Sequence, residues 1–530
     1  MFIDARTLPN GQVLDTDICI VGGGAAGITL AKELMGSGLK VTLLESGDHG
    51  YEERTQSLYA GPNLGFPAWE LDRQRIRALG GSTHHWAGNC MPLDPIDFEA
   101  REGIPYSGWP IGRADLDPFY PRAQKLVETP VDTNYDTLEN LQAIDKEPLK
   151  TNPDLLRTHL YAESPPTNFG QVYEDDLAAA VDVSVYLNAN VLEIDSNETA
   201  SEVTAMQVAC IDGPRFTVKA RRYVLALGGI ETPRLLLLSN KVAPAGLGND
   251  NDLVGRFFMD HASIRPSLLV LQAAGSSSTD LYTEAHEVNG GYFRGALAAS
   301  EKVLRDEQLP NFNFFLFSNS RSPGQSSAIT LRRTLGRGNM PDDLSRHLAN
   351  VLTDLDGVTN EMYRKLSGSD EDLIDRDWLH PWIVCETIPN PESRVKLVEE
   401  RDDIFGQNRI GLDWRMTAED LRVFHRATEI LAMELGRLGF GRVWSELLED
   451  PSEWPQTGHG KHHCGTLRMS DNPRAGVVDQ NCRMHGISNL YVAGSSVFPT
   501  HGHATPTLTI VALAIRLADQ IRTDAGRGAL

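Results

Sequence analysis

A glycine-rich turn between two short apolar runs, within residues 15–45, constrains this chain more than any other stretch. Gly22, Gly24 and Gly27 hold the G-x-G-x-x-G positions directly after the first run, which predicts a strand, a tight turn and a helix. The first two glycines let a pyrophosphate approach backbone N–H groups, and the third lets the helix pack closely on the strand. Glu45 ends the second run, where an acidic side chain accepts hydrogen bonds from ribose hydroxyls. The turn predicts a dinucleotide site without distinguishing a nicotinamide from a flavin cofactor.

Length and charge limit the remaining possibilities. A chain of 530 residues is too long for one simple core, so we expect two domains or one large discontinuous fold. Its formal charge of −23 repels phosphate backbones and anionic lipids, which argues against nucleic acid or a membrane surface as a partner. The N-terminus lacks a basic segment followed by an apolar one, and no apolar run of about 18 residues occurs. We therefore expect a cytoplasmic protein without direct membrane insertion.

Histidines gather near the C-terminus. The two segments concerned carry His459, His462, His463 and Cys464, followed by His501 and His503. Such residues suit either a metal site or acid/base chemistry. The first segment lacks the i, i+4 spacing of helical metal ligands, and adjacent residues on an extended backbone point apart. The six cysteines of the chain also form no CxxC pair. We predict no metal, which leaves acid/base chemistry or a coincidental gathering of histidines as the interpretations.

Three further stretches carry recognisable motifs. Residues 77–94 form a second glycine-punctuated loop, and residues 228–239 place Gly-Gly before a helix in which the missing N–H of Pro233 is harmless. A His-x-x-Gly-Thr block begins at His462. In this order, the stretches resemble the glucose–methanol–choline (GMC) flavin oxidoreductases. The segments 80–86, 252–261 and 496–500 look most like the sugar-oxidising branch of pyranose oxidases and bacterial fructose or gluconate dehydrogenases.

The resemblance implies an α/β fold with a Rossmann-type FAD-binding domain and a discontinuous α+β substrate-binding domain built on a mostly antiparallel sheet. We assign residues 1–100, 176–261 and 451–530 to the FAD-binding domain and residues 262–450 to the substrate-binding domain, with a helical insertion at 320–378. Residues 101–175 are expected to connect and cover these parts.

The resemblance also implies FAD as the cofactor, in an extended pose. The residues predicted to bind it are Gly22, Gly24, Gly27, Glu45, Gly81, Ser82, His85, Asn89, Gly494, Ser495, Pro506 and Thr507. His85 falls where choline oxidase and pyranose oxidase carry the histidine that is linked covalently to the flavin. A ring-packing or hydrogen-bonding histidine is the alternative, and the linkage stays open.

Alcohol oxidation by a flavin needs a base for the hydroxyl proton while a hydride leaves the carbinol carbon for flavin N5. In the family, the first residue of the His-x-x-Gly-Thr block is that base, so we predict His462 for this role and His463 for support. A second family position, Asn or His in relatives, falls on Thr505 here. Thr505 is no base, and before Pro506 it predicts a helix N-cap whose dipole favours reduced flavin.

Another histidine could replace the missing family residue. His503 or His501 is the candidate, and a solvent-facing loop histidine is the alternative for each. The site residues for catalysis are therefore His462, Thr505 and His503.

We expect oxidation of an alcohol to a carbonyl, with a sugar, glycoside or polyol-like hydroxyl favoured by branch resemblance alone. Electrons would then pass to oxygen or to another acceptor, and a homo-oligomer or a small partner subunit is open. Two alternatives remain. One is a flavoprotein subunit of an electron-transfer dehydrogenase complex, and the other is a redox-neutral flavoprotein with an altered site at Thr505.

Overall fold

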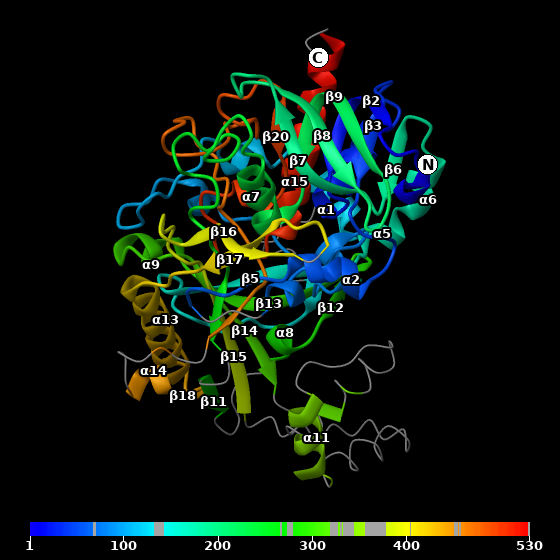
Figure 1. The fold of residues 1–530 in the computed structure, drawn as a ribbon. Coiled ribbons are helices and arrows are strands. Elements are labelled where there is room, and N and C mark those ends of the chain that lie inside the picture. The colour runs from blue at the N-terminus through cyan, green and yellow to red at the C-terminus, as the bar shows by residue number, and fades with distance from the viewer. Residues whose placement is uncertain are drawn as a thin grey trace, which may run out of the picture.

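Two large sheets organise the molecule, one above the other in the view of Figure 1. The computed structural model describes residues 1–66, 70–131, 143–264, 268–272, 279–318, 327–328, 331, 344–353, 355, 378–402, 404–449, 454 and 457–527. Both termini lie near the upper sheet (Figure 1).

The upper sheet has eight strands. In spatial order these are β1 (Phe2–Asp4), β6 (Val183–Leu187), β3 (Val41–Leu44), β2 (Val13–Val21), β9 (Arg215–Leu225), β8 (Val203–Ala209) and β7 (Asn190–Ser196), with β20 (Leu490–Val492) paired to β9. The first five run parallel, as β20 does to β9, whereas β7 and β8 continue the sheet as antiparallel strands. Parallel strands are buried on both faces, which explains the continuous apolar run at the end of β2.

The lower sheet has ten strands, and every pairing in it is antiparallel. In spatial order these are β18 (Gly441–Ser445), β11 (Leu268–Gln272), β15 (Trp378–Cys385), β14 (Phe312–Ser318), β13 (Gly291–Ala299), β5 (Leu156–Glu163) and β4 (Asn89–Cys90), with β10 (Ala262–Ile264), β19 (Thr457–His459) and β12 (His286–Val288) at its sides. A separate hairpin pairs β16 (Arg394–Arg401) with β17 (Asn408–Asp413).

Helices cover and connect the sheets. They are α1 (Ala25–Leu34), α2 (Glu53–Gln56), α3 (Tyr120–Leu126), α5 (Phe169–Val172), α6 (Glu174–Ala179), α7 (Gly228–Leu238), α8 (Asp280–Thr283), α9 (Glu301–Asp306), α11 (Leu344–Thr353), α13 (Ala418–Arg437), α14 (Glu446–Glu449) and α15 (Thr507–Gly526). In α13, Thr417 and Asp420 form a reciprocal capping box. Within the described parts of the chain, no helix is both long and apolar enough to cross a membrane.

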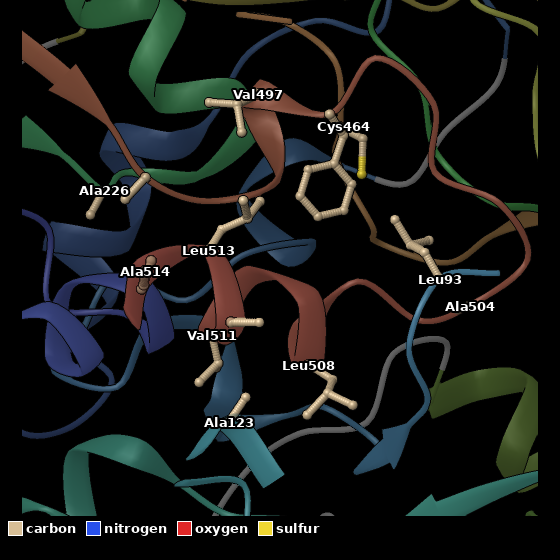
Figure 2. Close-up of a cluster of buried hydrophobic side chains, with 14 of the residues drawn as sticks. Leu93, Ala123, Ala226, Cys464, Val497, Ala504, Leu508, Val511, Leu513 and Ala514 are labelled. Atoms are coloured by element: carbon tan, nitrogen blue, oxygen red, sulfur yellow. The ribbon is translucent and has the colours of Figure 1, made fainter. Parts of the chain in front are cut away.

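An apolar cluster packs α15 against the segments that carry Cys464 and Val497 (Figure 2). Figure 2 shows Leu508, Val511 and Leu513 of α15 in one cluster with Cys464 and Val497. Burial raises the pKa of the Cys464 thiol well above its usual range. This cysteine is therefore a small apolar side chain in the core, as buried thiols commonly are.

The predicted fold class is confirmed: a parallel dinucleotide-binding sheet is combined with a mostly antiparallel one. Residues 101–175, expected to connect and cover, also supply β5 to the lower sheet. Of the insertion expected at 320–378, α11 lies within the described residues and most of the remainder lies outside them. The domain boundaries stay a prediction.

Candidate active site

A cavity of about 470 Å³ takes its lining from both sheets. Its walls include the turn after β2, the segment 81–89, the start of α7, the segment 458–463 and the residues before α15. Every site residue predicted from the sequence lines this cavity except Gly27 and His503. The predicted dinucleotide turn and the C-terminal histidines, more than 400 residues apart in the sequence, therefore share one site.

The three glycines of the first turn have different physical roles. Gly22 adopts a φ of +104°, and a Cβ there would lie 2.6 Å from the carbonyl oxygen of Ala226. A Cβ on Gly27 would lie 1.9 Å from the carbonyl oxygen of Gly22, so this residue is needed for packing. At Gly24 the nearest atom to a Cβ would be the Cα of Gly81 at 4.0 Å, which leaves open space beside the cavity.

That open space fits the pyrophosphate of FAD. Gly24 is the N-cap of α1 and offers no side chain to the first N–H groups of the helix, which have no partner within the helix. Such a terminus binds phosphate through its N–H groups and its dipole. Glu45 also lines the cavity beside this turn. Its carboxylate accepts hydrogen bonds from the N–H groups of Gly23 at 2.7 Å and Gly47 at 2.8 Å. Its remaining lone pairs suit a ribose hydroxyl.

The position predicted for Pro233 is wrong. Pro233 lies well inside α7 rather than in its first turn, so its missing N–H leaves the carbonyl of Gly229 without the helical donor. The hydroxyl of Thr466 donates to that carbonyl at 2.7 Å instead. The Gly-Thr part of the His-x-x-Gly-Thr block thus anchors the loop that carries His462 to the start of α7.

The capping role predicted for Thr505 is also wrong. α15 begins at Thr507 with Pro506 as its N-cap, because the hydroxyl of Thr505 donates to the carbonyl of Asn89 at 2.6 Å. This hydrogen bond connects the start of α15 to the segment 81–89, which contains several of the residues predicted to bind FAD. Pro506 and Thr507 still line the cavity, so the positive end of the α15 dipole faces it.

His462 lies where a base for a bound alcohol is needed. Its backbone N–H donates to Oδ1 of Asp260 at 2.8 Å, and its Nδ1 lies 2.9 Å from Nδ1 of His261. Within the described residues, no protein group bonds its Nε2, and the side chain lines the cavity. Burial lowers the pKa of His462 while Asp260 opposes the shift, so the imidazole is neutral at neutral pH. A neutral imidazole with a lone pair toward the cavity can accept a hydroxyl proton.

Asp260 and His261 are functional residues that the sequence reasoning missed. His261 lines the cavity, and its Nε2 contacts the carbonyl of Gly502 at 2.9 Å. Burial raises the pKa of Asp260, but His459, whose Nδ1 lies 3.3 Å from Oδ2 of Asp260, outweighs this and lowers the pKa to about 2. The carboxylate thus stays ionised beside two histidines. The sequence did contain a signal for both residues, because they end the stretch 252–261, one of the segments that resemble the sugar-oxidising branch.

His463 also lines the cavity, although adjacent residues were expected to point apart. Its Nε2 lies 2.7 Å from Oε1 of Gln74, and its ring packs against Phe258. Burial lowers the pKa of His463 to about 3. With that nitrogen occupied, His463 is suited to hold the loop rather than to take a substrate proton.

His503 is buried outside the cavity lining, which is a correction to its predicted catalytic contact. Its Nε2 lies 3.1 Å from Oδ2 of Asp94, and its Nδ1 lies 3.1 Å from Nδ2 of Asn313. Both ring nitrogens therefore have protein partners. Burial and the neighbouring carboxylates Asp94 and Glu386 raise the pKa of Asp97, in the same cluster, to about 7.

His85 opens onto the cavity beside the predicted flavin loop. The side chain is exposed, but desolvation by nearby protein lowers its pKa to about 4, and the charges of Lys461 and His84 add to the effect. The imidazole is neutral at physiological pH, as both attachment to a flavin and ring packing require.

The lower sheet forms the opposite wall. Phe315 and Val384 line the cavity together with Trp382, whose ring centroid lies 6.3 Å from that of Phe315. Among them, Ser263 of β10 is buried and lines the cavity, and its hydroxyl has no hydrogen-bond partner within the described part of the chain. An apolar wall with one unpaired hydroxyl suits a ligand that carries both C–H surface and hydroxyl groups.

Two known protein families match parts of this chain. The GMC oxidoreductase family matches residues 389–514, and the pyridine nucleotide-disulphide oxidoreductase family matches residues 16–265. The fructose dehydrogenase large subunit of Gluconobacter japonicus is 24% identical over 98% of this chain and 100% of its own length. The 2-methyl-1,2-propanediol dehydrogenase of Mycolicibacterium austroafricanum is 24% identical over 96% of this chain and 95% of its own.

A crystal structure of formate oxidase has the same fold, with a TM-score of 0.57, 18% identity and coverage of 98% of this chain and 100% of that one. The fold and the cavity define an FAD-dependent oxidoreductase that acts on CH–OH groups. Residues 389–514 carry the match to the GMC oxidoreductase family, and the chain is similar over nearly its whole length to the two dehydrogenases named above. The resemblance noted in the sequence and the FAD cofactor are thereby confirmed.

Proposed function

We propose that this protein oxidises a hydroxyl group of a sugar, glycoside or other polyol-like compound, with His462 as the base. The observation that carries the proposal is the position of His462, which lines a cavity shared by the dinucleotide turn and the aromatic wall and has its Nδ1 beside His261. FAD, when bound, supplies the acceptor for the hydride that leaves the carbinol carbon.

The other residues of the cavity hold the substrate for this step. Phe315 and Trp382 supply aromatic surface for the C–H side of a sugar, and Ser263 adds a buried hydroxyl that has no partner among the described residues. Thr505 contributes differently from the Asn or His of relatives. Because its hydrogen is committed to Asn89, it can accept from a substrate hydroxyl but cannot donate to it.

An anaerobic screen tests the proposal. Sugars, diols, glycosides and simple alcohols are added to the yellow holoprotein, and bleaching of the flavin absorbance is followed. We expect polyol-like compounds to bleach fastest and His462→Ala to slow the best of them by about 100-fold or more. His485→Ala, at a histidine bonded to the carbonyl of Ser470, serves as the matched control. Equal rates in His462→Ala and the parent would remove His462 as the base.

The electron acceptor, a partner subunit, the covalent attachment of FAD and the cellular location stay predictions. Hydrogen peroxide formation in air would indicate oxygen, whereas fast reduction of an artificial dye without peroxide would indicate another acceptor or a partner subunit. Yellow colour retained in an acid-precipitated pellet, and lost in His85→Ala, would establish covalent attachment through His85. The cytoplasmic location is tested by cell fractionation.

A further inference from the structure

Three imidazoles are in contact one after another, and the first two of them line the cavity. We define the imidazole relay as His462, His261 and His501. Nδ1 of His462 lies 2.9 Å from Nδ1 of His261, and Nε2 of His261 lies 3.1 Å from Nδ1 of His501. Neighbouring rings are nearly perpendicular, with interplanar angles of 88° and 83°. His261 and His501 are buried, so solvent does not compete for these nitrogens.

The far end of the relay has fixed partners. Nε2 of His501 lies 3.2 Å from both the backbone N–H and the hydroxyl oxygen of Thr387. The hydroxyl of Thr387 in turn donates to the carbonyl of Asp260 at 3.2 Å. Glu386 and Asp260 act electrostatically on His501 and favour its charged form, although burial lowers its pKa to about 4. Glu386 is also fixed, because it accepts from the N–H of Gly502 at 3.1 Å and pairs with Arg101.

Neutral imidazoles carry one N–H each, so the relay has two hydrogen arrangements. In the outward arrangement, each N–H points away from the cavity: His462 donates to His261, His261 donates to His501 and Gly502, and His501 donates to the hydroxyl of Thr387. In the inward arrangement, the N–H of Thr387 donates to His501 and every imidazole N–H points toward the cavity. The outward arrangement leaves a bare Nε2 on His462, and the inward one leaves an N–H there.

The contacts favour the outward arrangement at rest. The carbonyl of Gly502 can only accept, and it lies 2.9 Å from Nε2 of His261, so it requires the N–H on that nitrogen. The competing contact, from the N–H of Thr387 to His501, is longer at 3.2 Å. The outward arrangement leaves the backbone N–H of Thr387 without an acceptor, and the inward one leaves the carbonyl of Gly502 without a donor. Each loss costs about 1–3 kcal/mol, so the two arrangements are close enough in free energy to interconvert.

We propose that His261 fixes the base tautomer of His462 and that the imidazole relay carries the substrate proton away from the cavity. This rests on the proposed function of His462. The hydroxyl O–H bond breaks and an N–H bond forms at Nε2 of His462, while the electron pair stays on the substrate oxygen. Nδ1 of His462 then passes its proton to Nδ1 of His261, and Nε2 of His261 passes its proton to Nδ1 of His501. One proton has entered, and the positive charge ends on His501 beside Glu386 and Asp260.

Nitrogen NMR of protein labelled at histidine tests the tautomer without any substrate. We expect the protonated nitrogen of His462 to be Nδ1 and Nε2 to be bare in the parent. In His261→Phe, which has no acceptor, a mixture of tautomers should appear. A parent in which Nε2 of His462 carries the proton, or a His261→Phe variant with an unchanged tautomer, would overturn the proposal.

The proton inventory of flavin bleaching, measured in mixtures of H2O and D2O, tests the transfer. We expect a curved inventory in the parent, because several protons move together, and a linear one in His261→Asn. The asparagine Oδ1 can still accept from Nδ1 of His462, but an amide does not relay protons, so bleaching should slow about 10-fold. His485→Asn should match the parent. A His261→Asn variant with a curved inventory and a parental rate would refute the relay.

These measurements separate the two proposals. If no alcohol bleaches the flavin of the parent, the proposed function fails, and the NMR tautomer of His462 still decides the role of His261. If alcohols bleach the parent and the His261 variants behave as the parent in both measurements, the proposed function stands and the relay is wrong.

Discussion

Replacing Asp260 by Asn removes a buried charge while keeping the shape of the side chain. Oδ1 of Asp260 accepts the backbone N–H of His462 at 2.8 Å, and Oδ2 lies 3.3 Å from Nδ1 of His459. Burial alone would raise the pKa of Asp260, but His459 lowers it from an ordinary value near 3.8 to about 2. At about 1.36 kcal/mol per pH unit, this difference corresponds to roughly 2 kcal/mol of stability at neutral pH.

The sign of the pH dependence follows from the lowered pKa. The ionised form is favoured in the folded state, so the contribution of Asp260 is fully present above about pH 4 and is lost as the pH falls toward 2. We expect Asp260→Asn to lower the free energy of unfolding by about 2 kcal/mol at pH 7. The gap between variant and parent should narrow below about pH 4. Denaturant midpoints of the holoprotein at pH 7 and pH 3.5 measure both values.

The same substitution changes the base in a predictable direction. The negative charge of Asp260 raises the pKa of His462 against the effect of burial, so its removal should lower that pKa further. The base works in its neutral form, and the acid limb of kcat/KM should therefore move to lower pH. The plateau rate should fall about 10-fold, since a weaker base transfers the proton less well.

An acid limb that stays in place or moves to higher pH in Asp260→Asn would refute this reasoning. So would a stability gap that is the same at pH 7 and pH 3.5. Asp479→Asn is the matched control, because Asp479 accepts the N–H groups of Asn481 and Arg483 in a turn. We expect no movement of the acid limb in that variant.

Three more predictions follow from single contacts. Gly24→Ala should weaken FAD binding at least 10-fold, measured by titration, and should leave the thermal midpoint of the apoprotein unchanged. Gly27→Ala should lower that midpoint, because its Cβ would lie 1.9 Å from a carbonyl oxygen. Thr466→Val should lower the free energy of unfolding by about 1–3 kcal/mol, because the carbonyl of Gly229 loses its donor. Adding Pro233→Ala should recover part of this loss, since the new backbone N–H can bond that carbonyl, and a double-mutant cycle measures the coupling. Thr505→Asn should speed flavin bleaching up to about 10-fold in stopped-flow assays, because an amide can donate to the substrate oxygen; a slower variant would contradict this.

Local sequence signals predicted the elements whose structure depends on nearby residues. The strand, turn and helix around Gly22 follow from backbone freedom and apolar spacing. The start of α15 did not follow, because a distant carbonyl at Asn89 captures the hydroxyl of Thr505. Pro233 was misplaced for a similar reason, since the donor that replaces its N–H comes from Thr466 in another segment.

The cofactor end of the site could be predicted more fully than the substrate end. A pyrophosphate is bound largely by backbone groups, whose position is set by a short glycine pattern. The substrate end is assembled from side chains of separate strands, such as Ser263, Phe315 and Trp382. No periodicity in the sequence shows that these residues of β10, β14 and β15 line the same cavity. The pairing of the antiparallel strands brings them together.

The histidines near the C-terminus show why residue type alone does not define a base. A base needs a lone pair that no protein donor occupies and that a substrate can reach. His463 lies in the cavity, but its Nε2 is held by Gln74, and His503 has partners on both nitrogens outside the cavity. His462 meets both conditions within the described residues, because His261 takes its Nδ1 and leaves Nε2 toward the cavity. Since these partners come from distant parts of the chain, the choice among the histidines is made by tertiary contacts rather than by the histidine motif itself.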